Sequence, residues 1–370
     1  MIETRFHPRI ADIPATDWDA LRPDGNPFVS HAFLHALEDG GCIRPDWGWQ
    51  AHHLCLYEHG RLRAAAPLYL KGNSHGEFVF DWSWAAAWER AGGDYYPKLL
   101  CGVPYSPVPG PRLLAGGDAA LQAALVEALR REAERLQLSS VHANFLLDDE
   151  AHVFSEDWLA RSDVQFHWHN SGWRDFDGFL AALNHKKRAN IRRERAHVEA
   201  SGLRIDWRDG ATLTAAEWDA VHALYLATFD AKGNHAALTP AFFRQLGGMA
   251  QLALAHDADG IAAMALFLES DGVLYGRYWG SRVDVPGLHF ELCYYRGIDH
   301  ALAQGLQRFE PGAQGEHKLA RGFLPVRTHS RHLLLHQGFR AAVRAALRDE
   351  ARAMERYADK CMAHSPYAQH

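Results

Sequence analysis

Short apolar runs separated by turn residues divide the first half of the chain into predicted strands. Three of these runs predict a meander, at residues 52–57, 62–70 and 77–80. Residues 118–136 then repeat apolar positions at helical spacing, with charged residues on the other face. Residues 140–147 follow as a buried strand. The pattern therefore predicts an antiparallel meander that ends in a strand, a helix and a strand.

The second half repeats this plan. Four runs predict strands, at residues 252–256, 261–268, 273–279 and 306–310, and 288–304 predicts a helix before the last of them. Residues 60–71 and 260–271 align as corresponding strands, each opened by a glycine turn. We interpret the chain as two copies of one α/β unit, with mixed sheets flanked by helices. Chance similarity of two hairpins is the alternative.

The repeat predicts two domains, at residues 1–170 and 171–370. A chain of 370 residues fits two domains of ordinary size. A further helical pattern at about 340–360 ends the chain. This C-terminal helix can pack on either domain, including back on the first.

Composition narrows the class of protein without naming its chemistry. Hydrophobic residues are 48% and charged residues 23% of the chain, and 39 basic against 45 acidic residues give a net charge of −6. A general DNA-binding protein is usually basic, so we expect no DNA partner. Five cysteines without CxxC spacing are typical of a reducing compartment, and no apolar run is long enough to span a membrane. We expect a cytoplasmic protein without membrane insertion.

A basic run lies within a helical pattern that extends from Phe176 to about Ala200. Six basic residues share it, namely Lys186, Lys187, Arg188, Arg192, Arg193 and Arg195. Glu194 is the one acid among them. A run of this density favours an anion-binding face, although a solvated helix face is the common alternative.

Several segments together resemble a known family. Asn184–Gly202 is similar to the basic helix that opens the second domain of Fem-type peptidyl transferases. Four later segments match that family in order: Leu274–Gly280, Leu288–Glu291, Gly305–Gly315 and His317–Phe323. Tyr95–Lys98 and Pro104–Arg112 are similar to the FemAB-like branch, which is associated with peptidoglycan biosynthesis or recognition. The resemblance covers roughly residues 20–340.

The resemblance implies tandem N-acetyltransferase-like (GNAT) domains, in agreement with the internal repeat. It also implies transfer of an acyl or aminoacyl group onto an amine by direct attack in a ternary complex. The donor would be an acyl-CoA or an aminoacyl-tRNA, and the acceptor a small-molecule or peptide amine, such as a peptidoglycan precursor. No metal is implied. Two other functions stay open, a CoA-dependent N-acetyltransferase of a small amine and a non-catalytic protein that binds a precursor.

Two departures from related enzymes affect the choice of donor. Single-domain GNAT enzymes have a glycine-rich motif that binds acetyl-CoA, and Arg296–Ala301 matches this motif only weakly. The long helical hairpin that some Fem proteins insert in the second domain is absent from the sequence. A tRNA contact that depends on this hairpin is therefore in doubt.

Three residues near the end of the second repeat are candidates for catalysis. By resemblance, Lys318 matches the family's lysine and would stabilise an oxyanion or a phosphate, or else it is a surface lysine. His317 has the pKa range to accept the amine proton. Glu310 is the last residue of a predicted strand, before a proline and a glycine. Its side chain would either face the mouth of the cleft or cap the turn.

Further residues are candidates for binding substrates. Arg277, His289 and Glu291 lie beside the start of the helix predicted at 288–304, whose free amide groups favour an anion. The basic residues Lys186, Lys187, Arg188, Arg192 and Arg193 would hold phosphate. Tyr95, Lys98 and Arg112 are candidates for the acceptor side in the first domain.

A metal site is not predicted. His329, His332 and His336 share one face if their segment is helical, yet no carboxylate accompanies them at ligand spacing. We interpret these three as surface histidines.

Overall fold

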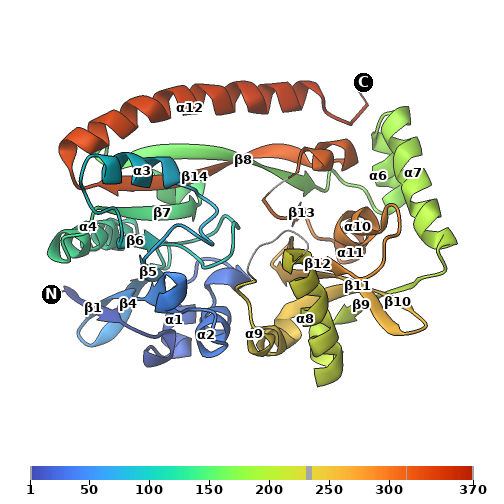
Figure 1. Cartoon of the computed structure of the whole chain (residues 1–370), viewed down its shortest axis with the longest axis horizontal. Helices are drawn as coiled ribbons and strands as arrows, with labels where there is room; N and C mark the ends of the chain where they lie inside the picture. Colours follow the sequence, from blue (N-terminus) through green and yellow to red (C-terminus); the bar gives the residue numbers. More distant parts are fainter. Residues whose placement is uncertain (1, 231–235, 314, 369–370) are drawn as a thin grey trace. The chain divides into compact units, whose positions relative to one another are not determined.

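The computed structural model describes residues 2–230, 236–313 and 315–368, which form two compact units. The first unit comprises Met1–Val164 and Arg327–Tyr357, and the second comprises Gln165–Val326 and Ala358–His370 (Figure 1). Both units are mixed α/β structures with sheets flanked by helices, which confirms the predicted fold class. Among the described residues, no helix combines the length and the hydropathy needed to cross a membrane.

The first unit contains two sheets. Its strands are β1 (Ile2–His7), β2 (Trp49–Ala51), β3 (His53–Glu58), β4 (Arg61–Ala66), β5 (Leu68–Lys71), β6 (Lys98–Cys101), β7 (Ser140–Leu146), the start of β8 (Leu159–His169) and the end of β14 (Leu324–Leu334). The order β1-β3-β4 makes the smaller, antiparallel sheet, and β2-β5-β6-β7-β14-β8 makes the first unit's part of the larger one. Within the larger sheet, β6 and β7 pair in parallel.

Helices cover these sheets because their apolar faces match the buried faces of the strands. The helices are α1 (Ala15–Asp19), α2 (His31–Asp39), α3 (Trp82–Arg90), α4 (Ala119–Arg135), α5 (Asp148–Ala151) and α12 (Gln337–Ala363). Leu125 and Leu129 of α4 are fully buried with Leu54, Leu99 and Val141 in the main core of the unit. The helix α12 lies along β8, where Glu350 pairs with Arg161 (Figure 1).

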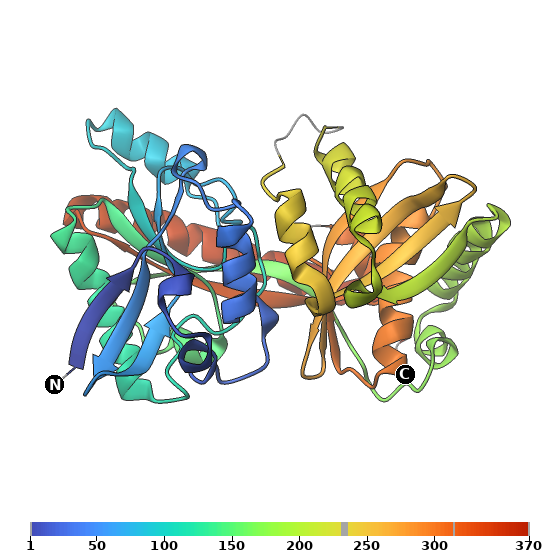
Figure 2. The same cartoon turned by 90° about the horizontal axis from the view of Figure 1, so that it is seen from below.

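The second unit contains one sheet of the same design. Its strands are the end of β8, β9 (Arg204–Asp209), β10 (Ala250–Asp257), β11 (Gly260–Ser270), β12 (Val273–Ser281), β13 (Arg308–Glu310) and the start of β14. They follow the order β8-β13-β12-β11-β10-β9, in which β12 and β13 pair in parallel. The helices are α6 (Phe176–Ala182), α7 (His185–Ala200), α8 (Ala215–Asp230), α9 (Pro240–Leu246), α10 (Leu288–Phe290) and α11 (Arg296–Ala303). Figure 2 shows α8 and α9 next to one another beside this sheet.

The internal repeat predicted from the sequence is visible in the topology. In the first unit, α4 connects the parallel strands β6 and β7. In the second, α10, a π-helical turn (η6, Glu291–Tyr295) and α11 form one continuous helical segment that connects β12 and β13. Each unit therefore contains a meander followed by a parallel pair with a helical connection.

Two predicted strands differ from the structure. The strand predicted at 62–70 is divided at Pro67, because proline lacks the N–H that a continuous ladder needs, and its halves β4 and β5 lie in different sheets. The strand predicted at 77–80 does not form. Glu77 is instead buried in an ion pair with Lys98, and Phe78 takes a left-handed backbone conformation with φ 60°.

Two predictions about longer segments also differ. The helix predicted from Phe176 to Ala200 is divided, because Leu183 is extended and the Asn184 side chain caps α7 by accepting from the Lys187 N–H at 3.1 Å. The compact units differ from the predicted division into 1–170 and 171–370. Residues 327–357, with most of the C-terminal helix, belong to the first unit, since β14 pairs with β7 there.

Of the three predicted surface histidines, His336 is exposed and His329 partly exposed, whereas the prediction is wrong for His332. His329 and His332 lie on the strand β14 and not on a helix. The His332 side chain is buried, with its Nδ1 2.6 Å from Nδ1 of His142 on β7. Strand alternation, which the helical interpretation ignored, places it inside.

Candidate active site

The candidate site of the second unit lies where the parallel strands β12 and β13 part. Their pairing ends at Tyr275 opposite Glu310, while β12 continues to Ser281. A Cβ on Gly276 would lie 3.2 Å from the Pro311 Cα, so glycine permits the close approach of the two backbones just after the last pair. The chain leaving β13 then leads into the helical turn η7 (Glu316–Arg321), which contains two of the predicted catalytic residues.

Lys318 is a buried lysine without a carboxylate partner among the described residues. Its side chain is 2% exposed, and Nζ donates to the Gly312 carbonyl oxygen at 2.5 Å. Burial lowers the pKa of Lys318 to about 7; the nearby Cys293 opposes this shift and Arg277 adds to it. The lysine therefore changes charge near neutral pH, unlike the surface lysine that was the alternative.

Glu310 is a buried carboxylate at the end of β13. Its Oε1 lies 2.9 Å from Arg308 Nε, whereas its Oε2 accepts no hydrogen bond from the described residues and lies 3.9 Å from His167 Nε2. Burial raises the pKa of Glu310 to about 7 despite the opposing charges of Arg308 and Arg277. Burial also lowers the pKa of His167 to about 3, so that His167 is neutral. A carboxyl group poised near neutral pH can accept a proton from a reacting amine.

His317, a residue of η7, lies among aromatic rings. Its Nε2 is 2.8 Å from the Tyr294 Oη, and its ring contacts those of His289 and Phe290. Burial lowers the pKa of His317, and Arg321 and Lys318 lower it further. The imidazole is therefore held in its neutral form and can accept a proton.

A buried ion pair attaches η7 to the basic helix α7. Arg321 is 6% exposed, and its Nη2 is 2.7 Å from Glu194 Oε1. The Tyr295 hydroxyl donates to Glu194 and accepts from Arg321 Nε at 3.0 Å. Arg321 also donates to the His317 carbonyl oxygen at 2.8 Å, so this cluster holds the backbone next to Lys318.

Glu291 forms ion pairs with two arginines, although its Oε2 accepts no hydrogen bond from the described residues. Its carboxylate is 3.2 Å from Arg195 and 2.9 Å from Arg296, and Arg195 also binds Asp299 at 2.8 Å. Burial raises the pKa of Glu291 against the opposing effect of Arg195 and Arg296. Glu291 therefore holds α7 against the π-helical turn, and its carboxylate has two cationic partners already.

The basic run on α7 divides into an inner and an outer part. Arg195 turns inward to Glu291 and Asp299, and Arg188 donates to the carbonyl oxygens of Ala181 and Leu183. Four cations remain outside these contacts: Lys186, Lys187, Arg192 and Arg193. None of these four forms an ion pair with a described residue, although Arg193 donates to the Asn190 side chain. The outer part is therefore a cationic surface without neutralising acids.

The three candidates in the first unit are bound internally. Lys98 is fully buried and donates to Ser74 and Glu77 at 2.9 Å and to Asp81 at 2.6 Å, and Tyr95 donates to Asp81 at 2.6 Å. The predicted acceptor role has no support from either side chain.

Arg112, the third of these candidates, is also fully buried. Its guanidinium donates to the carbonyl oxygens of Asn144, Pro111 and Val108 at 2.7–3.2 Å. A guanidinium used in this way holds the surrounding loop and has little capacity left for a substrate.

The structure brings together some predicted residues and adds others. Lys318, Glu310 and Arg277 share one electrostatic neighbourhood in the second unit, and His317 and His289 share another. Sequence reasoning missed Glu194, Tyr294, Tyr295, Arg321 and His167. Glu194 had a signal as the single acid within the basic run, whereas the others became recognisable only through their contacts.

Comparisons with known proteins agree with this fold. The sequence profile of the FemAB-like family, described as peptidoglycan biosynthesis/recognition, matches residues 9–369. A crystal structure of FemX has a TM-score of 0.54 at 11% identity, covering 92% of this chain and 100% of that one. The C-terminal domain of a lysylphosphatidylglycerol synthetase from Agrobacterium fabrum has a TM-score of 0.55 at 11% identity, covering 90% of this chain and 94% of that one.

The L-PGS of Bacillus licheniformis has a TM-score of 0.50 at 11% identity, covering 88% of this chain and 98% of that one. No curated protein matches the sequence. At these identities the solved structures establish a shared fold, while the sequence profile spans almost the whole chain and establishes the family. The protein is a member of the FemAB-like family.

Proposed function

We propose that this protein transfers an acyl or aminoacyl group onto an amine acceptor, with the chemistry in the second unit. The observation that supports this most is Lys318, a buried lysine with a pKa near 7 beside the point where β12 and β13 part. The family's association with peptidoglycan biosynthesis/recognition supports a peptidoglycan precursor as the acceptor. The structural similarity to proteins described as FemX and lysylphosphatidylglycerol synthetase agrees with group transfer.

In the proposed step, the acceptor's neutral amine attacks the donor's carbonyl carbon. A C–N bond forms, and the C–O bond of an aminoacyl ester or the C–S bond of a thioester breaks after the tetrahedral intermediate. The protonated form of Lys318 donates a hydrogen bond to the oxyanion of that intermediate. Glu310 accepts the proton that the amine loses, and the leaving oxygen or sulfur takes up a proton from solvent or from the protein.

His317 is the second candidate for the base. Its neutral imidazole, next to Tyr294, can accept the same proton. The two bases are distinguishable by substitution, because Glu310 and His317 contact separate groups of side chains.

The cationic surface of α7 would hold phosphate of one substrate. Lys186, Lys187, Arg192 and Arg193 provide charges that no described acid neutralises. Both proposed donors, acyl-CoA and aminoacyl-tRNA, carry phosphates, as does a nucleotide-linked acceptor.

The first experiment measures ligand binding and then product formation. The protein is screened by thermal shift with acetyl-CoA, longer acyl-CoAs, aminoacyl-tRNA, uncharged tRNA and a UDP-linked muropeptide. A ligand at about 100 times its dissociation constant stabilises the fold by about 2.7 kcal/mol. The ligands that bind are then combined, and the amide product is detected by mass spectrometry.

Variants test the assignment of residues. We expect Lys318→Met to reduce kcat about 100-fold or more, the usual effect of removing one oxyanion donor. The matched control is Lys360→Met, which changes an exposed lysine on α12 and should leave kcat unchanged. Charge reversal at Lys186, Lys187 and Arg192 should raise KM for the phosphate-bearing substrate.

The outcomes separate the candidate functions. Amide formation from an acyl-CoA alone indicates a CoA-dependent N-acyltransferase, and formation from aminoacyl-tRNA indicates an aminoacyltransferase. Binding of a precursor without product from any donor would contradict the proposed transfer. Full activity of Lys318→Met would contradict the assigned site.

A further inference from the structure

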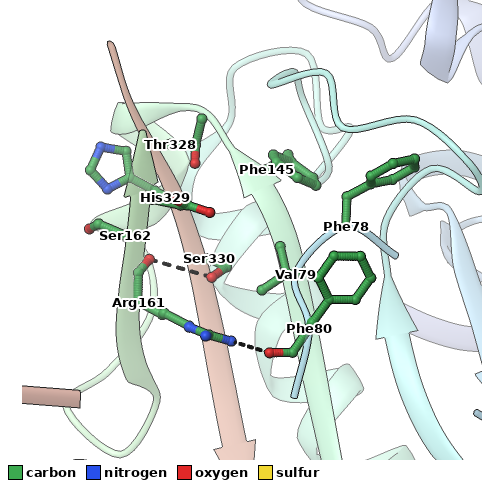
Figure 3. A pocket seen from close by; sticks show the side chains of 10 residues that line it. Phe78, Val79, Phe80, Phe145, Arg161, Ser162, Thr328, His329 and Ser330 are labelled. Carbon is green, nitrogen blue, oxygen red and sulfur yellow. Dashed lines mark hydrogen bonds between the residues drawn. The ribbon is translucent and has the colours of Figure 1, made fainter. Parts of the chain in front are cut away.

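A pocket in the first unit lies outside all the chemistry described above. It is lined by the loop segment Phe78–Phe80, by Phe145 of β7, by 161–163 of β8 and by 328–330 of β14 (Figure 3). It has about 100 Å³ of room for water-sized molecules and is open to solvent on one side. A closed cavity of about 150 Å³ holds one benzene ring, so this smaller, open pocket admits part of a single ring.

The apolar part of the pocket consists of aromatic rings held in unusual backbone conformations. Phe78 has φ 60° and Phe145 has φ 57°, a left-handed region that bulky side chains rarely occupy. Such strain persists where the surroundings enforce it, and it gathers at ligand sites. Figure 3 shows the rings of Phe78 and Phe80 on the loop, across from Arg161 and Thr328 on the strands.

The aromatic surface continues outside the pocket. Phe80 stacks on Trp82 with ring centroids 4.4 Å apart. Phe80 is 37% exposed and Trp82 is 49% exposed, and both are large apolar side chains left open to solvent. Phe80 lines the pocket and Trp82 stacks on it, so the two rings extend the apolar wall of the pocket to the surface.

The polar part of the pocket offers hydrogen bonds without excess positive charge. Arg161 is bound by Glu350 through both Nε, at 2.6 Å, and Nη2, at 3.2 Å, and it donates to the Phe80 carbonyl oxygen at 2.7 Å. Its charge is therefore already matched, which disfavours a phosphate or carboxylate as the ligand. Asp163 is exposed and has no cationic partner among the described residues.

Thr328 adds an unused polar group. Its side chain is 4% exposed and lines the pocket, and its hydroxyl has no hydrogen-bond partner among the residues that the structure describes. The hydroxyl oxygen is not among the fully buried atoms, so a ligand can bond to it in place of water.

We infer that this pocket binds a neutral sugar ring. A sugar has an apolar C–H face that packs on aromatic rings, here Phe80 and Trp82, and a rim of hydroxyl groups. The hydroxyls would bond to the Thr328 hydroxyl, the Asp163 carboxylate and the remaining N–H groups of Arg161. A flat aromatic ligand would use the rings but leave this set of rim groups largely unpaired.

The test is ligand-observed saturation-transfer NMR with the full-length protein. Glucose, galactose and N-acetylglucosamine are the probes, and uracil is the flat aromatic comparison. We expect at least one sugar to bind, with the strongest saturation on the protons of one C–H face. No donor is present, so the result stands apart from the proposed transfer reaction.

Three substitutions locate the binding. Trp82→Ala, Phe80→Ala and Thr328→Val should each weaken sugar binding about fivefold or more. The first two change exposed side chains, so the fold should persist, and a thermal melt checks this for all three. Met362→Ala is the control, since Met362 is also 49% exposed and lies far along the sequence on α12.

Three results would overturn the inference. One is the absence of saturation transfer to every sugar when the sugar is at millimolar concentration and in large excess over the protein. The second is binding that survives all three substitutions unchanged. The third is binding of uracil without binding of any sugar, which would assign the pocket to a flat aromatic ligand.

Discussion

Two buried lysines show how their partners decide the charge of a residue. Lys98 is fully buried, but Glu77 and Asp81 outweigh the effect of burial and raise its pKa. Lys318 is almost as buried, has a carbonyl oxygen as its partner, and has its pKa lowered to about 7. The first lysine is therefore a permanent internal cation, while the second can change its charge at neutral pH.

The pH dependence of stability tests the burial of Lys318. The folded pKa of about 7 lies below the unfolded value of 10.5, so the unfolded state binds more protons between these two pH values. The free energy of unfolding of the wild type should therefore rise with pH from 7 to 10 relative to Lys318→Met. The relative slope is at most about 1.4 kcal/mol per pH unit.

Urea unfolding at pH 7, 8, 9 and 10 measures this difference. Lys360→Met, at an exposed position, should run parallel to the wild type over the same range. Parallel curves for Lys318→Met as well would show that the Lys318 pKa is not lowered in the folded protein.

At the scale of elements, irregular features place the candidate residues. The π-helical turn η6 interrupts the helix between α10 and α11 and brings Tyr295 to Glu194 of α7, while Tyr294 meets His317 of η7. Turns of this kind are rare and occur often at functional sites. A regular helix over 288–304, as the apolar pattern predicts, would direct these side chains differently.

The ion pair between Glu194 and Arg321 should couple α7 to η7. We expect Glu194→Ala and Arg321→Ala each to destabilise the protein by about 1–3 kcal/mol, because each removes a charged hydrogen bond between side chains that are only 16% and 7% exposed. The double variant should cost less than the sum of the two. A double-mutant cycle in urea measures the interaction energy.

The pair Arg244–Asp219 is the reference for this cycle. Both of its side chains are about half exposed, so its interaction energy should be about 0–1 kcal/mol. An interaction energy for Glu194 and Arg321 as small as that of the exposed pair would contradict the proposed positioning of η7.

At the scale of the whole molecule, the first unit is made from two separated parts of the chain. Residues 327–357 contribute β14 and most of α12 to it, and β14 pairs with β7 from Ser140 to Leu146. A fragment that stops at residue 170 therefore loses the neighbour of a fully buried strand.

We expect fragment 1–170 to remain unfolded when it is expressed alone, because β7 would expose its unpaired edge and apolar face. Coexpression with fragment 327–370 should restore structure to part of it. Far-UV circular dichroism and hydrogen exchange measure the structure of fragment 1–170 alone and with fragment 327–370. The control is fragment 1–150 coexpressed with fragment 327–370, because this pair lacks β8. A cooperatively folded fragment 1–170 would contradict the discontinuous unit.

The sequence by itself determined the order of most strands and helices, the internal repeat, the family and the position of the basic helix. These features depend on local periodicity and on motifs whose residues are neighbours along the chain. Lys318 was found in the same way, through the segment His317–Phe323 that resembles the family.

The tertiary structure decided what depends on distant partners. It made Lys98 and Arg112 internal rather than accessible, turned Arg195 inward, and replaced the strand predicted at 77–80 by the aromatic wall of a pocket. It also placed residues 327–357 in the first unit. The ion-pair and strand partners lie from 17 positions apart, as for Lys98 and Asp81, to more than 180, as for the paired strands β7 and β14. Burial, charge compensation and strand pairing over such separations leave no local pattern, and this is why the sequence alone did not predict them.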